Sequence, residues 1–517
     1  MQQDWVSSIQ FPHGTRDIQW RETHISQILL TGVWVYKIKK PVDFGFLDFS
    51  TLEKRKYYCE EELRLNQRCA PELYVSVEAL CSDEGRYNFC GRGEVMDYAV
   101  KMKQFDPDSL LLIRIQDVPE QALFFQALGY SLAEFHASAA VSSDDQEFGR
   151  AESVRFPVEE NFRQILPRLS EQKDVARLEK IQAWSLQQSE QLALVFEQRK
   201  QQGRVRECHG DLHLANIALI DDKPVMFDCI EFNERFRWID VASDLAFLLM
   251  DLEFNGYSPQ ANRVLNSYLE YSGDYDLLRV LRYYKVYRAL VRAKVAVLRM
   301  EQARGDEVAT LLQQFRQHLD YAEAAFHSSE RYLVITCGVS GSGKSSVARQ
   351  LAARSGAIHL RSDVIRKQLA GLKPLESSAG LDPDNPDALY SQSYTVKTFE
   401  LLEALTGAVL GMGYSVIVDA TFLKRLARAP FLALAEKMGV SFHILYMDVP
   451  EAMLVARIRQ RESRGQDASE AGVAVMKQQL LDWQEFANSE QNSVVRMTEE
   501  PDIDSVAGRL WSEAPGA

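Results

Sequence analysis

The sequence contains no apolar run that approaches the ~20 residues a membrane-spanning helix needs. Its first residues, MQQDWVSSIQFPHG, also lack the basic segment and the apolar segment of a secretory signal. Neither absence is typical of a membrane-spanning or exported chain. We therefore expect a cytoplasmic protein without membrane partners.

Cysteine and positive charge are both in short supply. The seven cysteines are odd in number and form no CxxC pair, which argues against a disulfide framework and a zinc site and predicts reduced, mostly buried thiols. The 59 Lys and Arg residues are outnumbered by 73 Asp and Glu residues, so the net charge is −14. This balance disfavours loose binding to nucleic acid or anionic membranes. A phosphorylated substrate must then be met by a local basic cluster.

Length and patterning predict two domains in a chain of 517 residues. Residues 1–326 form a mixed small lobe (about 1–103) and a mainly helical large lobe (104–326), and residues 327–331 form a linker. The small lobe should contain a β-hairpin, because apolar and polar residues alternate on both sides of Thr31 and Gly32. Residues 332–517 alternate between strands and helices, as a parallel sheet with crossover connections requires.

The segment HGDLHLAN, residues 209–216, has the spacing of a kinase catalytic loop. In such a loop Asp211 accepts the proton of the acceptor hydroxyl and Asn216 holds a metal ion. Asp228 follows an apolar strand twelve residues later and supplies a second metal-binding group. These are hard oxygen donors, the type that Mg²⁺ prefers. The alternative is that these residues only form turn and capping hydrogen bonds.

With the lysine-bearing hairpin, this pattern resembles the aminoglycoside phosphotransferase family over roughly the first 325 residues. The resemblance implies a protein-kinase-like bilobal fold in which Lys37 orients the ATP phosphates and pairs with Glu62. Lys39 lies on the same strand face as Lys37 and is the alternative lysine, and Glu60 or Glu61 is the alternative to Glu62. The hinge that touches adenine would include Gln104. No GxGxxG loop precedes the hairpin, which favours a small-molecule hydroxyl acceptor over a protein.

Three polar residues of the large lobe are expected to have structural rather than catalytic roles. Asp240 and Asp244 begin an apolar helix, where negative charge is favourable, although they could also shape an acceptor pocket. His136 lies on another apolar helix and is expected to be a core histidine rather than a ligand.

A second phosphate-binding signature, GVSGSGKS, begins at Gly338 and fits GxxxxGK[ST] between a strand and a helix. Glycines let backbone amides face the phosphates, Lys344 neutralises the β- and γ-phosphates, and the Ser345 hydroxyl can bind Mg²⁺. The residues expected to contact this nucleotide are Gly338, Val339, Ser340, Gly341, Ser342, Gly343, Lys344, Ser345 and Ser346.

Further polar residues follow the next strands. Asp363, with Arg366 one helical turn later, lies at the edge of the sheet where ligands gather. Asp419 ends another strand and is the alternative base or a Mg²⁺ ligand. Arg457 and Arg461 share one helix face, either as a lid over the transferring phosphoryl group or as a solvated surface.

This half resembles the P-loop kinase group that includes polynucleotide kinase, gluconate kinase and zeta-type toxins, over about residues 332–500. The resemblance implies that Asp363 is the base and Arg366 an acceptor ligand. Arg425 either faces the acceptor or lies on the surface.

Together the halves resemble the bifunctional aminoglycoside phosphotransferase-like/ATP-binding proteins. The resemblance implies a Mg²⁺-dependent phosphotransferase with two ATP sites, GTP being the alternative nucleotide, that act on small-molecule hydroxyls. Two alternatives concern the P-loop half. It could phosphorylate RNA or nucleotide ends, or it could regulate the first domain.

Overall fold

The computed structural model describes residues 9–16, 18–45, 47–118, 121–326, 330–378, 389, 391–464, 471–497 and 502–512. The chain divides into two compact units. The first comprises Met1–Phe124, Phe135–Asp251 and Tyr283–Asp320, and the second comprises Phe125–Glu134, Leu252–Arg282 and Tyr321–Ala517. Among the described residues, no helix has both the length and the apolar character of a membrane span.

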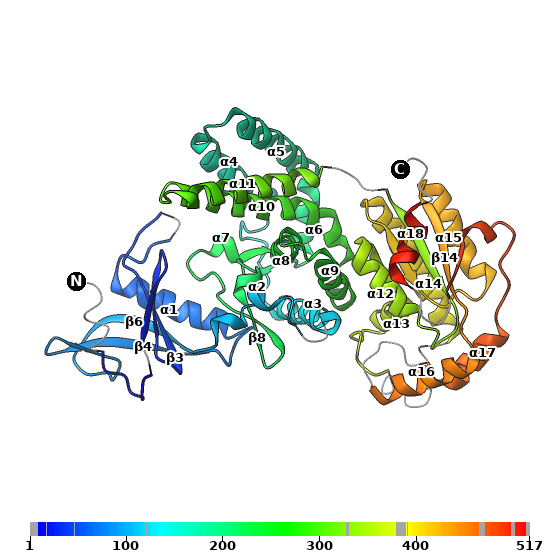
Figure 1. The fold of residues 1–517 in the computed structure, drawn as a ribbon, viewed down its shortest axis with the longest axis horizontal. Helices are drawn as coiled ribbons and strands as arrows, with labels where there is room; N and C mark the ends of the chain where they lie inside the picture. The colour runs from blue at the N-terminus through cyan, green and yellow to red at the C-terminus, as the bar shows by residue number, and fades with distance from the viewer. Residues whose placement is uncertain are drawn as a thin grey trace. The chain divides into compact units, whose positions relative to one another are not determined.

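An antiparallel sheet of six strands, in the order β1-β2-β3-β6-β4-β5, forms the small lobe (Figure 1). The predicted hairpin is confirmed, because β2 and β3 pair on either side of Thr31 and Gly32. One face buries Tyr36 and Ile38, which alternate along β3. The strands are β1 (Gln19–Glu22), β2 (Ser26–Leu30), β3 (Trp34–Lys39), β4 (Tyr74–Asp83), β5 (Arg86–Asn88) and β6 (Glu94–Lys103).

Helix α1 (Leu52–Asn66) packs against β4 and β6. Its N-cap is Thr51, whose side chain accepts a hydrogen bond from the backbone N–H of Lys54 at 3.3 Å. The helix buries Cys59 and, unusually for a carboxylate, Glu62. A buried charge of this kind needs a partner, which the neighbouring strand supplies.

A largely helical region follows, in which two short strand pairs flank the 209–216 segment. Strand β7 pairs with β10, and β8 pairs with β9. These strands are β7 (Val205–Glu207), β8 (Ile217–Ile220), β9 (Lys223–Met226) and β10 (Trp238–Asp240). The helices are α2 (Leu111–Arg114), α3 (Gln121–Ser138), α4 (Ala151–Ile165), α5 (Gln172–Gln191), α6 (Ala193–Gln201), α7 (Glu234–Arg237), α8 (Val241–Phe254), α9 (Ser258–Ser272), α10 (Leu278–Met300) and α11 (Asp306–Ala324).

The second unit is built on a five-stranded sheet in the order β12-β13-β11-β14-β15, in which every pairing is parallel. This confirms the predicted α/β fold class, as the antiparallel sheet and helices confirm the kinase-like fold of the first half. The strands are β11 (Tyr332–Cys337), β12 (Ile358–Arg361), β13 (Val416–Asp419), β14 (Ser441–Met447) and β15 (Val494–Met497).

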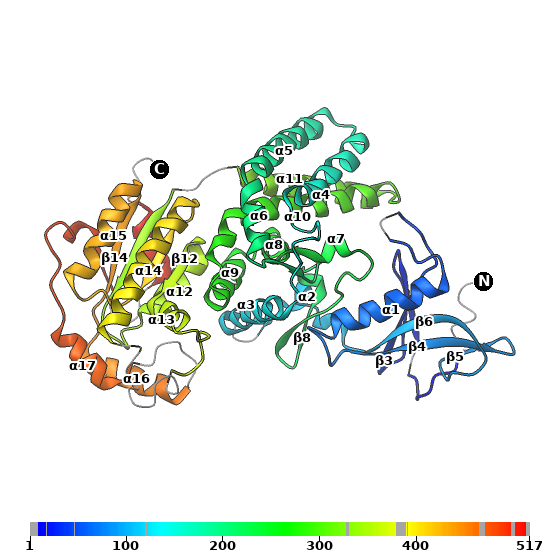
Figure 2. The ribbon, with the colours of Figure 1, turned by 180° about the vertical axis from the view of Figure 1, so that it is seen from behind.

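Helices cover both faces of this sheet (Figures 1 and 2). Helices α12 and α18 share an apolar core with one face, while α14 and α15 contact the strands from the other. Because the central strands β11 and β13 are covered on both sides, each is almost entirely apolar and buried. The helices are α12 (Lys344–Ser355), α13 (Ser362–Leu369), α14 (Gln392–Gly411), α15 (Arg425–Met438), α16 (Glu451–Arg464), α17 (Val473–Leu481) and α18 (Ile503–Ser512).

Candidate functional sites

The 209–216 loop turns sharply at Gly210, where protein kinases usually carry an arginine. The φ angle of Gly210 is +89°, and a Cβ atom at this position would lie 2.7 Å from the carbonyl oxygen of Phe236. Only glycine tolerates both the backbone conformation and the close approach. Arg288 of α10 donates hydrogen bonds to the carbonyl oxygens of Gly210 and Ser243, at 3.0 and 3.2 Å, and so links the loop to α8 and α10.

Asp211 and Asn216 face each other within the loop. The Asn216 amide nitrogen donates to the Asp211 carboxylate at 3.3 Å and to its carbonyl oxygen at 3.0 Å. Burial alone would raise the pKa of the Asp211 carboxyl. His213, whose Nε2 lies 3.4 Å from that carboxylate, together with smaller effects of His209 and Arg292, holds the pKa well below its usual range. Asp211 is therefore charged across the physiological pH range.

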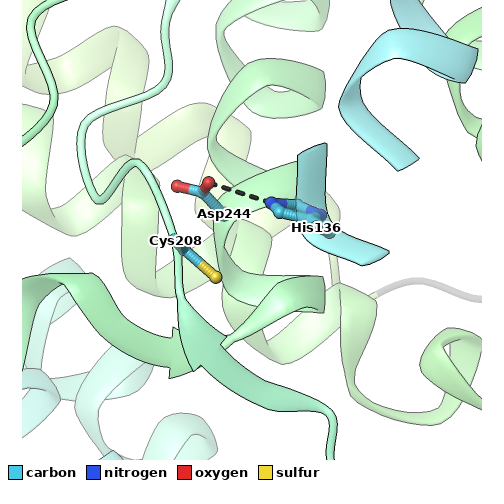
Figure 3. Close-up of side chains that lie close together, drawn as sticks. All are labelled: His136, Cys208 and Asp244. Carbon is cyan, nitrogen blue, oxygen red and sulfur yellow. Dashed lines mark hydrogen bonds and ion pairs between the residues drawn. The ribbon is translucent and has the colours of Figure 1, made fainter. Parts of the chain in front are cut away.

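Asp244 of α8 fixes the start of the loop. Its fully buried carboxylate accepts hydrogen bonds from the backbone N–H groups of His209 and Gly210, at 3.0 and 2.9 Å. His136 Nε2 lies 3.1 Å from the same carboxylate (Figure 3). Asp244 lies in the first turn of α8, as the interpretation of favourable helix-terminal charge predicted, and its carboxylate also binds the backbone of the loop. The other acidic residue of this helix start, Asp240, forms a buried ion pair with Arg199.

His136, Cys208 and Asp244 lie close enough together to suggest a metal site (Figure 3). Burial raises the pKa of the Cys208 thiol well above its ordinary value. Its sulfur donates to the carbonyl oxygen of Ile239 at 3.5 Å. The Asp244 oxygens are already used by the loop. The cluster is thus an anchor for the loop, and His136 is a core histidine.

Asp228 follows β9 in the left-handed region, with φ of +67°, a conformation that is uncommon outside glycine and recurs at functional sites. Its carboxylate lies 2.6 Å from the Nζ atom of Lys37 on β3. Lys37 Nζ also lies 2.8 Å from the Glu62 carboxylate of α1. Burial would lower the pKa of Lys37, but Asp228 and Glu62 outweigh it and raise that pKa. The hairpin, α1 and the segment after β9 thus meet at one point.

Lys39 shares Glu62 with Lys37 but lies deeper. Its Nζ contacts Glu62 at 2.7 Å and also the carboxylate of Glu231, and its side chain is fully buried. Glu62, between two lysines, has its pKa lowered to about 2, against the effect of its own burial. The contacts leave Lys37 beside Asp228 and Lys39 enclosed between two glutamates.

The predicted hinge continues directly from β6. The backbone N–H of Gln104 donates to the carbonyl oxygen of Val33, and the backbone N–H of Gly32 donates to the Gln104 side chain, each at 2.9 Å. The hinge is thereby tied to the hairpin turn that precedes Lys37.

The P-loop connects β11 to α12. Gly341 has φ of +81°, and a Cβ atom there would lie 2.9 Å from the carbonyl oxygen of Leu454 in α16. Lys344 Nζ donates to the carbonyl oxygen of Val339 at 2.8 Å. Ser340 N–H donates to the side chain of Gln479 at 2.7 Å. The loop is therefore held from within by Lys344 and from outside by α16 and α17. Ser345 is half-buried and Ser346 exposed in the first turn of α12.

Arg457 of α16 reaches this loop, because its guanidinium donates to the carbonyl oxygen of Ser342 at 3.2 Å. For Arg461, one turn later, the structure describes only the backbone. Arg425, at the start of α15, is exposed and donates to the carbonyl oxygen of Glu485 at 2.8 Å.

Asp363 and Arg366 form an ion pair of 3.0 Å in the first turns of α13. Arg366 is buried, whereas the Asp363 carboxylate is partly exposed. The pair directly follows β12, at the carboxyl edge of the sheet.

Asp419 ends β13 beside the P-loop strand, and the hydroxyl of Thr336 on β11 lies 3.4 Å from its carboxylate. Burial would raise the pKa of Asp419. His359 and Arg361, at 3.5 and 3.8 Å, outweigh that effect and hold the pKa well below its usual range. The carboxylate is therefore charged although it is buried.

Sequence reasoning missed several residues that hold these sites. Asp244, Arg288 and Glu231 act on the first site from distant segments, and no short motif marks them. His359 and Arg361 could have been found, because two polar side chains alternate on one face of an otherwise apolar strand.

Comparison with protein families finds two matches. Residues 58–284 match the phosphotransferase enzyme family, and residues 333–485 match an AAA domain family. Proteins of Mycobacterium tuberculosis and Mycobacterium bovis, both titled uncharacterized, are 29% identical over 466 residues, which is 90% of this chain and 90% of each relative.

Among solved structures, a choline kinase from Cryptosporidium parvum aligns with 60% of this chain and 90% of its own, with 9% identity and a TM-score of 0.39. A gluconokinase from Sinorhizobium meliloti aligns with 35% of this chain and 97% of its own, with 18% identity and a TM-score of 0.24. The family matches and the observed folds agree on the organisation of this chain: one segment matches the phosphotransferase enzyme family, and a second segment, a parallel sheet with a P-loop, matches an AAA domain family.

Proposed function

We propose that this protein is an ATP-dependent phosphotransferase with two nucleotide sites, each of which transfers the γ-phosphate to a hydroxyl acceptor. The observation that carries the proposal is the convergence in the first site. Asn216 is hydrogen-bonded to Asp211 within the loop, and its backbone carbonyl oxygen accepts from the N–H of Phe227, the residue before Asp228, at 3.0 Å. Lys37 is bound to Asp228 from a distant strand. A charged base, a metal-binding pair and a phosphate-orienting lysine are the parts that phosphoryl transfer requires.

In the first site, the oxygen of the acceptor hydroxyl would attack the γ-phosphorus, and Asp211 would accept the proton of that hydroxyl. The bond from the γ-phosphorus to the bridging oxygen of ADP breaks in the same step, and ADP leaves with that oxygen. The low pKa of Asp211 supports a role in orienting the hydroxyl and receiving its proton late, because the carboxylate is a weak base.

Asn216 and Asp228 would hold Mg²⁺, and their chemistry fits this ion. The side-chain nitrogen Nδ2 of Asn216 donates to Asp211, so the side-chain oxygen Oδ1 of Asn216 is the atom left for a cation. Mg²⁺, when bound, would neutralise charge on the β- and γ-phosphates. We assign phosphate orientation to Lys37 rather than Lys39, because Lys39 is fully buried between Glu62 and Glu231.

In the second site, the amides from Gly338 to Gly343 and Lys344 would hold a separate nucleotide, with Ser345 and Asp419 as the oxygen donors for Mg²⁺. Asp363 would activate the acceptor. We prefer small-molecule hydroxyls as acceptors and ATP as the donor, with GTP as the alternative. The Asp363–Arg366 pair supports a second candidate acceptor, an RNA or nucleotide end, whose phosphate the arginine could contact.

The test is transfer of labelled γ-phosphate into a fractionated cell extract that contains metabolites and RNA. Wild type, Asp211→Asn and Lys344→Ala are compared. If the two sites are independent kinases, the two variants will lose different labelled products. Loss of one shared product would mean sequential or regulatory action. If neither variant lost any product, the proposal would be wrong.

A further inference from the structure

Asp419 and three other ionisable side chains form a buried cluster, and each of the four residues is no more than 5% exposed. His359 lies between two carboxylates, with its Nε2 3.5 Å from Asp419 and its Nδ1 3.8 Å from Glu270. Arg361 also bridges them, at 3.8 Å from Asp419 and 3.5 Å from Glu270. The cluster thus contains two carboxylates that share one permanent cation and one imidazole.

Glu270 comes from α9, a helix of the second compact unit that precedes the P-loop segment in sequence. Two asparagines attach α9 to the P-loop fold. Asn262 donates to the carbonyl oxygen of Ala353 at 2.8 Å, and Asn266 accepts from the backbone N–H of His359 at 2.7 Å. Gln368 of α13 donates to the carbonyl oxygen of Glu270 at 2.8 Å. These three hydrogen bonds between side chains and backbone atoms fix the place of the helix that carries Glu270.

The charge of Glu270 changes what Arg361 does to Asp419. A buried guanidinium beside a single carboxylate would pair with it fully and compete with any cation for its oxygens. A second carboxylate at a similar distance divides that attraction. Tyr130 donates a hydrogen bond to Glu270 at 3.0 Å and helps to keep this carboxylate in place.

We propose that Glu270 is a positioning residue of the P-loop site, which shares the positive charge of Arg361 and so leaves Asp419 available to Mg²⁺. The inference rests on the proposed role of Asp419 in holding Mg²⁺ at a nucleotide site. It also means that residues 332–517 alone lack a group that this site needs. The fusion to the preceding helices is then a requirement of the P-loop site.

The experiment measures ATP binding calorimetrically with the full-length chain, in Mg²⁺ and in EDTA. Lys37→Ala is the parent background, because it weakens the first nucleotide site. Glu270→Gln keeps the shape and the acceptor oxygen of the side chain but removes its charge. The matched control is Glu134→Gln, which removes an exposed carboxylate of the same unit that pairs with Lys373.

We expect Glu270→Gln to weaken Mg²⁺ binding at the P-loop site about 10- to 100-fold, the usual effect of losing an outer-shell partner. ATP affinity in EDTA should stay unchanged, Glu270→Asp should restore part of the loss, and Glu134→Gln should match the parent. Unchanged Mg²⁺ affinity in Glu270→Gln would overturn the inference. An equal loss with and without Mg²⁺ would also overturn it, because it indicates general damage to the fold.

Adding Lys344→Ala to the same background separates this inference from the proposed function. A loss of ATP binding in that variant establishes the nucleotide site, and the Glu270 result then decides the inference by itself. Unchanged binding would remove the proposed P-loop site and the inference with it.

Discussion

Replacing Asp244 by asparagine tests whether a buried carboxylate outside the motif holds the catalytic loop. The wild-type carboxylate accepts two backbone N–H groups of the loop and contacts His136. Asparagine retains one acceptor oxygen and turns a donor toward one of those N–H groups. Hydrogen bonds to a charged group contribute about 1.5–3 kcal/mol each, and breaking a buried charge pair costs about 3–5 kcal/mol. We therefore expect the free energy of unfolding to fall by about 3–5 kcal/mol.

The pH dependence of stability provides a second measure of the same residue. Burial would raise the pKa of Asp244, but His136, and less strongly His209 and Arg288, lower it to about 2. The pKa is thus lower in the folded than in the unfolded chain, so this stabilisation is present above pH ~4 and is lost as the pH falls from ~4 to ~2. A shift of nearly two units corresponds to about 2 kcal/mol. Asp244→Asn should lack this acid-dependent part.

Urea unfolding at neutral and acidic pH measures both effects, and phosphate transfer to the Asp211-dependent product measures catalysis. A loop displaced by ~1 Å should lower kcat about 100-fold. Asp276→Asn, which alters a partly exposed helix-surface pair with Arg279, is the matched control and should behave as wild type. Wild-type stability and wild-type kcat in Asp244→Asn would refute the reasoning.

Three further substitutions test other contacts. Gly210→Ala should lower kcat about 100-fold and stability by about 1–3 kcal/mol, because its Cβ would meet the Phe236 carbonyl at a positive φ; equal kinetics and an equal urea midpoint would contradict this. Lys37→Met should raise KM for ATP with little change in the urea midpoint, whereas Lys39→Met should destabilise the fold by about 3–5 kcal/mol by stranding buried carboxylates. If instead Lys39→Met raised KM for ATP and Lys37→Met destabilised the fold, Lys39 would be the lysine that orients the phosphates. Arg457→Gln should weaken ATP binding at the P-loop site about tenfold by releasing the Ser342 carbonyl; unchanged affinity would show that this contact is dispensable.

Local sequence determined the two fold classes and the two loops. The period-2 alternation around Thr31 predicted a hairpin, and the five mainly apolar runs after residue 331 form a parallel sheet, because strands covered on both faces carry mostly apolar side chains. The P-loop glycines and the spacing from Asp211 to Asn216 are local constraints on the backbone. These constraints can be recognised in a short segment of the sequence, because the residues concerned are only a few positions apart.

The tertiary structure alone decided which distant charges hold those loops in place. Lys37 and Lys39 share a strand face, and only the fold shows that one meets Asp228 while the other is enclosed by Glu231. Asp244 looked like ordinary helix-terminal charge until its carboxylate was found on the loop backbone. Such contacts link segments far apart in the chain, and a buried charge takes its partner from whatever the fold brings within about 4 Å. The periodicity and spacing of residues along the sequence do not reveal which distant charges lie within that distance in the folded chain.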